Sequence, residues 1–302
     1  MNLKVYTERS TRKAAPASAR PGRETRIAVF TVLIFGAALS AVLLLSLSGS
    51  GGQSPITTIS VPPDGKTPYP VGALSAADPS GRAPTGATAL PGYVRTYVSD
   101  FAGTTLPAGW DPFTGVPGGD PTGQFAASHV TVGSGMLQLS SWRDPAFGGR
   151  WVTGGLCHCG HPQTYGAYFV RSRITGAGPN ESDLLWPLNN QWPPEVDFNE
   201  TGAVAISTSW TVHFGGDNSI VQQTLHLDMT KWHTWGVIWT PTTLTFTIDG
   251  VSWGALRLPA AIPHLAMTLD LQQRTSCSTP DACGPGMRQS MLVDWVTEYA
   301  PA

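Results

Sequence analysis

One segment of the chain carries three carboxylates at a spacing that could do chemistry. Residues 192–200 read WPPEVDFNE, in a protein with only 13% charged residues. On a β-strand, Glu195 and Asp197 point to the same face, whereas Glu200 would point to the other. A one-residue bulge between Asp197 and Glu200 would return the third carboxylate to the face of the first two. The segment therefore predicts three carboxylates in a row.

Glycoside hydrolysis is one reaction that needs such a row. A retaining glycosidase uses an ionised carboxylate as nucleophile and a protonated carboxyl as acid, about 5–5.5 Å apart. Neighbouring negative charge keeps the acid protonated until the nucleophile is glycosylated. Trp186 and Trp192 flank the row and could stack on sugar rings. The alternatives are a solvated edge strand, a cation site, and core packing for the two tryptophans.

The elements that must position these residues are β-strands. From residue 93 onward, short alternating runs recur between turn signals, and no stretch has a period of 3.6. Ten or more strands predict an all-β fold, an antiparallel β-sandwich (jelly roll) with a concave substrate cleft. In strand 267–274, alternation places the side chain of Gln272 on the polar face, away from the apolar face. The tryptophans of 232–239 are expected to lie in the core.

The segment Leu184–Glu200 resembles the active-site strand of glycoside hydrolase family 16, in its laminarinase-type branch. Further matches follow in order: YGAY at 165–168 with Arg171, His213, WHTWGVIWTP at 232–241, IDG at 248–250 and VDWV at 293–296. The resemblance covers residues 92–302 and implies a jelly roll with a retaining, endo-acting β-glucanase activity.

The resemblance also implies roles for individual residues. Glu195 becomes the nucleophile, Asp197 the assisting carboxylate and Glu200 the acid/base. Trp186, Trp192, His213, Arg171 and Gln272 are the candidate substrate-binding residues. No cofactor is required; a structural calcium ion on the convex side would be held by Asp294.

The four cysteines, Cys157, Cys159, Cys277 and Cys283, are expected to form disulfides in an exported domain. Cys277–Cys283 closes a short loop, whereas Cys157–Cys159 would close a tiny ring, so cross-pairing between the two loops competes. The run CHCGH at 157–161 could instead bind zinc.

The N-terminal part of the chain predicts export. Residues 1–26 form a basic head with net charge +5, and residues 27–48 are 22 residues without a charge. This length suits a transmembrane signal anchor, or else a signal peptide, with the catalytic domain extracellular. Residues 49–91, rich in Pro, Gly, Ser and Thr, are expected to be a flexible linker.

Composition narrows the function further. The net charge of −2 argues against a basic surface that would bind nucleic acid, and the low content of charged residues argues against a coiled coil. The expected partners are a polysaccharide substrate and, through residues 27–48, a membrane; the chain is expected to be a monomer. A transglycosylase of cell-surface polysaccharide and a non-catalytic carbohydrate-binding sandwich are the competing functions.

Overall fold

The computed structural model of this protein describes residues 67–276 and 284–302. Regular structure in these residues is almost entirely β, which confirms the all-β prediction. The helices in the described part are single 3₁₀ turns: η1 (Ala127–His129), η2 (Pro145–Phe147), η3 (Pro259–Ala261) and η4 (Pro285–Met287).

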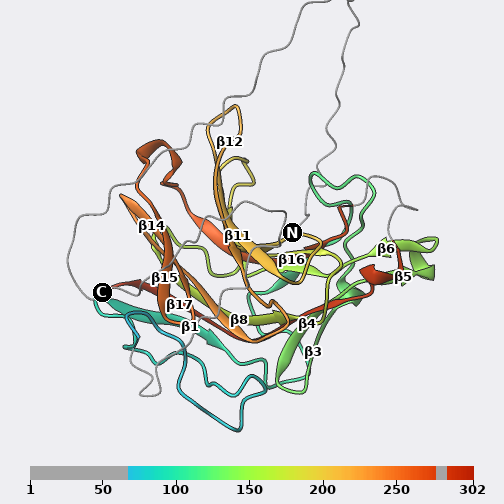
Figure 1. Ribbon diagram of the computed structural model, residues 1–302, viewed down its shortest axis with the longest axis horizontal. Coiled ribbons are helices and arrows are strands. Elements are labelled where there is room, and N and C mark those ends of the chain that lie inside the picture. The colour runs from blue at the N-terminus through green and yellow to red at the C-terminus, as the bar shows by residue number, and fades with distance from the viewer. Residues whose placement is uncertain (1–66, 277–283) are drawn as a thin grey trace, which may run out of the picture. The chain divides into compact units, whose positions relative to one another are not determined.

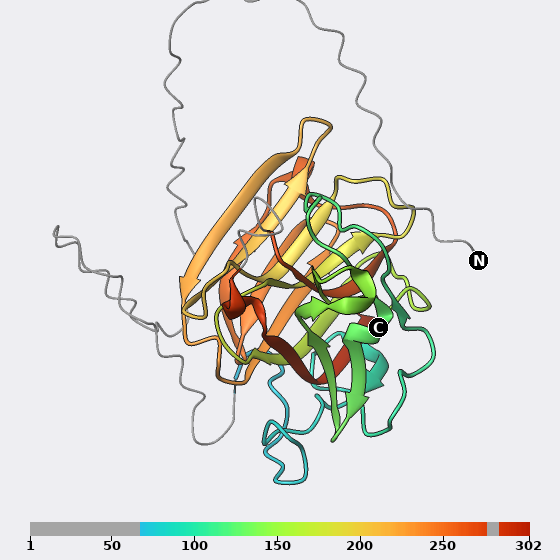
Figure 2. The same cartoon turned by 90° about the vertical axis from the view of Figure 1, so that its right-hand side faces the viewer.

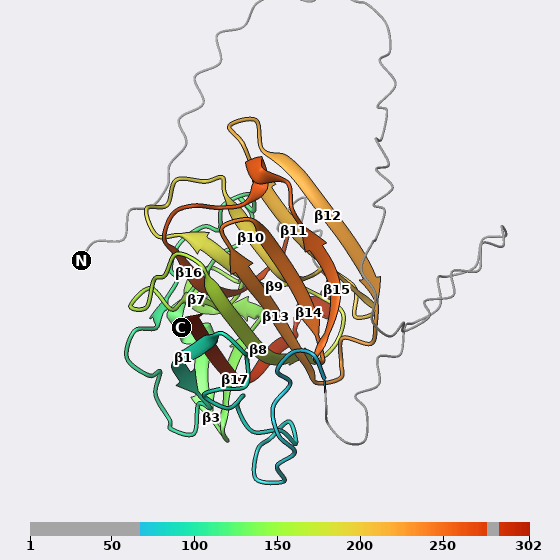
Figure 3. The same ribbon diagram turned by 90° about the vertical axis from the view of Figure 1, so that its left-hand side faces the viewer.

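Two antiparallel sheets make up the sandwich (Figure 1). In the outer sheet, seen in Figure 3, the strand order is β15-β14-β13-β8-β17-β4-β3, and β1 pairs with β17. The bounds are β15 (Val251–Leu256), β14 (Thr243–Ile248), β13 (His233–Thr240), β8 (Gly166–Ile174), β17 (Ser290–Pro301), β4 (Met136–Ser140), β3 (Val130–Gly133) and β1 (Tyr93–Ser99).

The inner sheet has the order β12-β11-β10-β9-β16-β7-β2, and its strands are seen from another side in Figure 2. The bounds are β12 (Ser219–His226), β11 (Ser207–Phe214), β10 (Glu195–Thr201), β9 (Asn180–Pro187), β16 (Met267–Arg274), β7 (Gly155–Cys157) and β2 (Asp111–Pro112). A separate hairpin joins β5 (Trp142–Asp144) to β6 (Arg150–Val152).

Strand alternation puts one face of each sheet into a shared core. Trp210 of the inner sheet stacks on Phe246 of the outer sheet, with ring centroids 4.5 Å apart. Trp235 and Trp239 are fully buried in the same core, as predicted. Trp232 is only half-buried and lies under the guanidinium of Arg173, outside the core cluster. The other face of the inner sheet points away from this core and carries polar side chains.

Residues 67–91 do not form the flexible linker that their composition predicts. Leu90 packs with Phe169 and Trp295 in a second buried cluster on the outward face of the outer sheet. Thr85 is buried and hydrogen-bonds to the hydroxyl of Tyr299 at 2.6 Å. These few apolar and hydroxyl side chains attach the segment to the sandwich, so the folded body begins before residue 92.

The predicted membrane segment, residues 27–48, and the basic head lie outside the described residues. Among the helices of residues 67–276 and 284–302, none is long and apolar enough to cross a membrane.

Candidate active site

A bulge in β10 places the three carboxylates. Glu195 pairs with His213 of β11 and Asp197 with Thr211, and the register then shifts before Glu200 pairs with Ser209. The ladder to β9 shifts over the same stretch. Because of the extra residue, Glu200 returns to the face of Glu195 and Asp197, as the sequence predicts.

The two residues at the bulge, Phe198 and Asn199, point toward the core and are held there by packing and hydrogen bonds. Phe198 enters the core cluster, and Asn199 is buried in a polar network. Its side-chain amide donates to Asp183 Oδ2 at 2.9 Å and accepts from Thr208 Oγ1 at 2.7 Å. Asp183 is fully buried, and burial raises its pKa to about 7. This network fixes the backbone turn that aims Glu200 at the open face.

We use "open face" for the side of the inner sheet that points away from the core. Directly paired residues share a face, so cross-strand pairs to the carboxylates identify its members. The pair Asp197↔Leu184 continues to Asp270 and then to Cys157 across β16 and β7. Trp186 and Gln272 belong to the same face through their pairs with Thr268 and Ser182.

Glu195 lies at the start of β10, almost completely buried. Its Oε2 accepts a 2.6 Å hydrogen bond from Trp192 Nε1. Burial raises the pKa of Glu195, while the charge of His213 and the Trp192 hydrogen bond oppose this rise. Glu195, Asp197 and His213 each place a ligand-type atom within 4.8 Å of the others. The indole bond holds Oε2 and thereby orients the Glu195 carboxyl group.

Asp197 is the most strongly perturbed carboxyl of the three. Burial, with the charges of Glu195 and Glu200 adding to it, raises the pKa of Asp197 well above its usual range. His213 Nε2 lies 3.9 Å from Asp197 Oδ2, and its other ring nitrogen is 2.8 Å from Asn218 Oδ1. Burial and the neighbouring charges therefore favour the protonated form of Asp197.

Glu200 is oriented by side chains on three strands. Asn180 donates to its Oε1 at 3.2 Å and Thr211 donates to its Oε2 at 3.0 Å. Arg274 of β16 lies 3.6 Å from Oε1. Gln222 of β12 in turn donates to Thr211 Oγ1 at 2.8 Å. Both carboxyl oxygens are thus held while the group remains partly accessible.

The two tryptophans occupy different parts of the site. Trp192 is 43% exposed and its ring lies 5.6 Å from that of His213. It also lines a pocket of about 410 Å³ together with Phe214, Ile262 and Pro263. Trp186 is half-buried, and its indole nitrogen donates to Asn190. Trp192 is therefore the exposed ring at the edge of the site, and Trp186 lies on the open face through its pair with Thr268.

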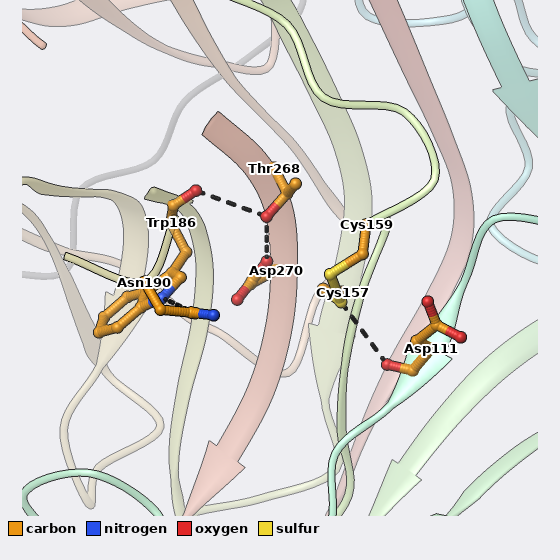
Figure 4. The surroundings of a disulfide bond; sticks show 7 residues. All are labelled: Asp111, Cys157, Cys159, Trp186, Asn190, Thr268 and Asp270. Atoms are coloured by element: carbon orange, nitrogen blue, oxygen red, sulfur yellow. Dashed lines mark hydrogen bonds between the residues drawn. A yellow bond between two sulfur atoms is a disulfide. The ribbon is translucent and has the colours of Figure 1, made fainter. Parts of the chain in front are cut away.

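Asp270 is a member of the open face that the sequence patterning places there but did not single out. Figure 4 shows it between the Trp186 side chain and the disulfide. Thr268 donates to its Oδ1 at 3.0 Å. Burial raises the pKa of Asp270 well above its usual range, and the charge of Glu195 adds to the rise. The signal in the sequence was its position two residues after Thr268, on the polar side of an alternating strand.

The cysteines of the CHCGH run are joined to each other: Cys157 bonds Cys159, so these two do not cross-pair with the second loop (Figure 4). The tiny ring, which its size disfavours, is therefore the one present. Cys277 and Cys283 lie outside the described residues. With both sulfurs oxidised, the zinc hypothesis loses its cysteine ligands.

Arg171 is not a substrate-binding residue of this site, contrary to the prediction. It lies on the outward face of the outer sheet, where its guanidinium donates to Ser80 Oγ at 2.6 Å and to Thr234 Oγ1 at 3.1 Å. Asp249 is 3.9 Å away. Burial lowers the pKa of Arg171 to about 10. The outward face of β8, which also carries Phe169, is covered by residues 67–91.

Asp294, the predicted calcium ligand, lies on the same outward side. Its Oδ2 accepts from the Ser80 amide at 3.0 Å, while its buried Oδ1 has no hydrogen-bond partner. An unpartnered buried carboxylate oxygen fits a hard cation such as calcium, which prefers oxygen ligands.

Comparisons with known proteins agree with this architecture. A family model described as glycosyl hydrolases family 16 matches residues 122–281, more than half of the chain. A comparison with curated protein sequences gave no match.

Three similar solved structures share the fold. The laminarinase from Rhodothermus marinus is 18% identical, with a TM-score of 0.61 over 70% of this chain and 98% of that one. The endo-β-1,3-glucanase from Pyrococcus furiosus is 17% identical, with a TM-score of 0.59 over 70% and 95%. A family 16 protein of the Bacteroides ovatus mixed-linkage glucan locus is 20% identical, with a TM-score of 0.56 over 67% and 99%. The match to the family model, on a sandwich with this row of carboxylates, places the chain in glycoside hydrolase family 16.

Proposed function

We propose that this protein is a retaining, endo-acting glycoside hydrolase that cleaves a β-1,3- or mixed β-1,3-1,4-glucan. The observation that carries the proposal is the bulge in β10, which brings Glu195, Asp197 and Glu200 onto the open face. Family membership supports the reaction class, and the structurally similar laminarinases and mixed-linkage glucan protein support the choice of glucan.

In the first step, Glu195 is the nucleophile. Its carboxylate attacks the anomeric carbon, and the bond from that carbon to the glycosidic oxygen breaks. Glu200 gives its proton to the departing oxygen. The product is a sugar bound covalently to Glu195, whose negative charge is then gone.

In the second step, Glu200 is a base. It takes a proton from a water molecule, whose oxygen attacks the anomeric carbon and releases Glu195 as a carboxylate. Asn180 and Thr211 hold Glu200 in place through both steps. Two inversions at one carbon give net retention of configuration.

In this mechanism, Asp197 limits the negative charge beside the nucleophile. Because its pKa is raised well above the usual range, its protonated form is favoured, and in that form it can donate a hydrogen bond to the Glu195 carboxylate. Two adjacent ionised carboxylates would repel each other in this buried position. The nucleophile can therefore stay ionised while its neighbour is neutral.

Azide rescue tests the two glutamate roles separately. Glu195→Ala removes the nucleophile, so azide should enter the vacated space and give a glycosyl azide of inverted configuration. Glu200→Ala leaves the nucleophile, so an activated substrate should still react and azide should restore turnover with retained configuration. Asp217→Ala, at an exposed turn residue, is the matched control and should keep parental activity.

Each other outcome has a meaning. If both glutamate variants keep near-parental activity on every glucan that the parent cleaves, the assignment is wrong. Opposite stereochemistry in the two rescue experiments would exchange the roles. Lengthened products would identify a transglycosylase, and binding without turnover a carbohydrate-binding protein. A screen of laminarin, lichenan, agarose and carrageenan should give turnover on the first two.

We also propose that the catalytic domain is extracellular and tethered through residues 27–48. The charge asymmetry around that apolar run supports this topology. Protease added to intact cells should reach the domain. A domain degraded only after lysis would contradict the proposal.

A calcium ion at Asp294 would be structural and take no part in the chemistry, because Asp294 is on the outer sheet. No other cofactor is needed for the proposed reaction.

A further inference from the structure

A second cluster of ionisable side chains lies apart from the proposed active site. His158 and His161, from the CHCGH run, meet Glu298 of β17. His158 Nδ1 is 2.6 Å from Glu298 Oε1, and His161 Nδ1 is 2.7 Å from Oε2. The three side chains come from two segments about 140 residues apart in the sequence. Their convergence is not explained by the proposed hydrolysis.

The cluster is buried and rigid on one side and accessible on the other. Glu298 and His158 are almost completely buried, whereas the His161 side chain is 33% exposed. The ring of His158 stacks on Trp110 at 4.6 Å and lies 4.0 Å from Tyr97. Bonding of the cysteines on either side of His158 further restricts this loop. The site is therefore held in place before any ligand arrives.

We propose that His158, His161 and Glu298 bind a divalent transition-metal ion of the zinc type. Two imidazoles and one carboxylate are a ligand set that zinc uses when it keeps a fourth position open. The three ligand atoms lie within 4.8 Å of one another. The exposed side of His161 gives the ion and a fourth, water ligand access. This inference is independent of the proposed glycosidase function.

The existing contacts are close to those that a metal would need. Ligand atoms bound to one zinc ion at about 2.0–2.1 Å in a tetrahedron lie about 3.3 Å apart. The two contacts go to different oxygens of Glu298, so each must lengthen by roughly 0.6–0.7 Å and the carboxylate must turn to bind through one oxygen or both. His161 is the partly exposed member that can move. Each Nδ1 must also be free of hydrogen, so both rings carry their proton on Nε2 in the metal-bound state.

An unpartnered polar group beside the cluster gives a second reason. Tyr168 of β8 pairs directly with Glu298 in the outer sheet, and its side chain is fully buried. The Tyr168 hydroxyl has no hydrogen bond of good geometry, although Gln163 lies near enough to oppose the rise of its pKa. Buried polar groups nearly always have a partner, and a metal-bound carboxylate or water would supply one.

The other two ligand-type clusters in the described residues are weaker. Cys157 and Cys159 with Asp111 have lost their thiolates to the disulfide. Glu195, Asp197 and His213 belong to the proposed active site. Zinc binding must therefore be shown to use His158 and His161 rather than His213.

Calorimetric titration of the full-length oxidised protein with Zn²⁺ tests the proposal. One equivalent is expected to bind, and Co²⁺ at the same site should give visible absorption bands of a low-coordinate ion. His158→Ala, His161→Ala and Glu298→Gln should each lose stoichiometric binding. His213→Ala and His264→Ala should keep it, the latter as a control for a histidine in a different hydrogen bond.

His161→Ala guards against misfolding, because His161 is the least buried member; its melting temperature without metal should be measured beside the titration. Absence of stoichiometric Zn²⁺ binding to the parent would overturn the proposal. So would binding that survives His161→Ala in a folded protein, binding lost in His213→Ala, or binding lost after thiol alkylation, which would assign the ion to cysteine.

Discussion

The bulge in β10 depends on Asn199, and replacing this residue by alanine should weaken both the fold and the site. The Asn199 amide donates to Asp183 Oδ2 at 2.9 Å and accepts from Thr208 Oγ1 at 2.7 Å. All three side chains are at most 3% exposed. Asn199→Ala therefore leaves Thr208 without this acceptor and leaves Asp183 Oδ2 with one donor, Ser172.

The magnitude follows from those two losses. A buried polar group that loses its partner costs about 1–3 kcal/mol; Thr208 loses its partner and Asp183 loses one of two donors, so the free energy of unfolding should fall by roughly 3 kcal/mol. This is a large share of the 5–15 kcal/mol that typically stabilises a domain. The rate of catalysis should fall by more than the loss of folded protein explains. Glu200 is the next residue, and this turn sets the direction of its side chain.

Urea unfolding followed by tryptophan fluorescence measures the first effect, and glucan hydrolysis under conditions where the variant is folded measures the second. Ser209→Ala is the matched control, because it removes one hydrogen bond, to Thr224, on the next strand. That variant should lie within about 0.5 kcal/mol of the parent. An Asn199→Ala protein within about 1 kcal/mol of the parent and with parental turnover would refute the anchoring role.

Four further outcomes are expected. Since the pKa of Asp183 is raised from 3.8 to about 7, its burial destabilises the fold increasingly as pH rises from 3.8 to 7. Asp183→Asn should gain relative stability over that range in urea unfolding, approaching about 4 kcal/mol; a pH-independent difference would contradict this. Trp192→Phe keeps a ring but removes the 2.6 Å bond to Glu195, so kcat should fall about tenfold with KM little changed. A chain that begins at residue 92 should melt roughly 5 °C or more below one that begins at residue 67, because it lacks the cover over the outer sheet; equal melting temperatures would restore the linker interpretation. Calcium should raise the melting temperature of the parent but not of Asp294→Asn, and chelation should leave the hydrolysis intact.

The sequence was most informative where its pattern broke a rule. A charge-poor chain that places three carboxylates in six residues invites an explanation, and the i+5 spacing of Glu200 requires a bulge if all three are to share one face. The register confirms that bulge. What the sequence could not reveal is how the bulge is held, because Asn199, Asp183 and Thr208 come from three strands whose pairing is a tertiary property.

Small loops and Pro-rich segments were predicted less well. The Cys157–Cys159 bond closes within a single turn, although the size of the ring alone disfavours it. Residues 67–91 have the composition of a linker, yet a few side chains such as Leu90 and Thr85 are enough to attach them. Average composition hides such anchors, because the apolar area that matters belongs to two or three residues.

Arg171 shows a limit that applies to any two-sheet protein. Alternation separates the polar from the apolar face of a strand, and in a sandwich the apolar faces meet in the core. Each sheet then has a second face that points away from the core, and the period of two cannot say which of these faces stays uncovered. In the outer sheet that face also carries Phe169 and Trp295. In β10 and β16 that face carries Glu195 and Asp270 and stays open; in β8 it carries Arg171, whose hydrogen bonds go to Ser80 and Thr234. Residues 67–91 make the difference, because they pack on Phe169 and Trp295 and hydrogen-bond to Arg171, and so cover the outward face of the outer sheet.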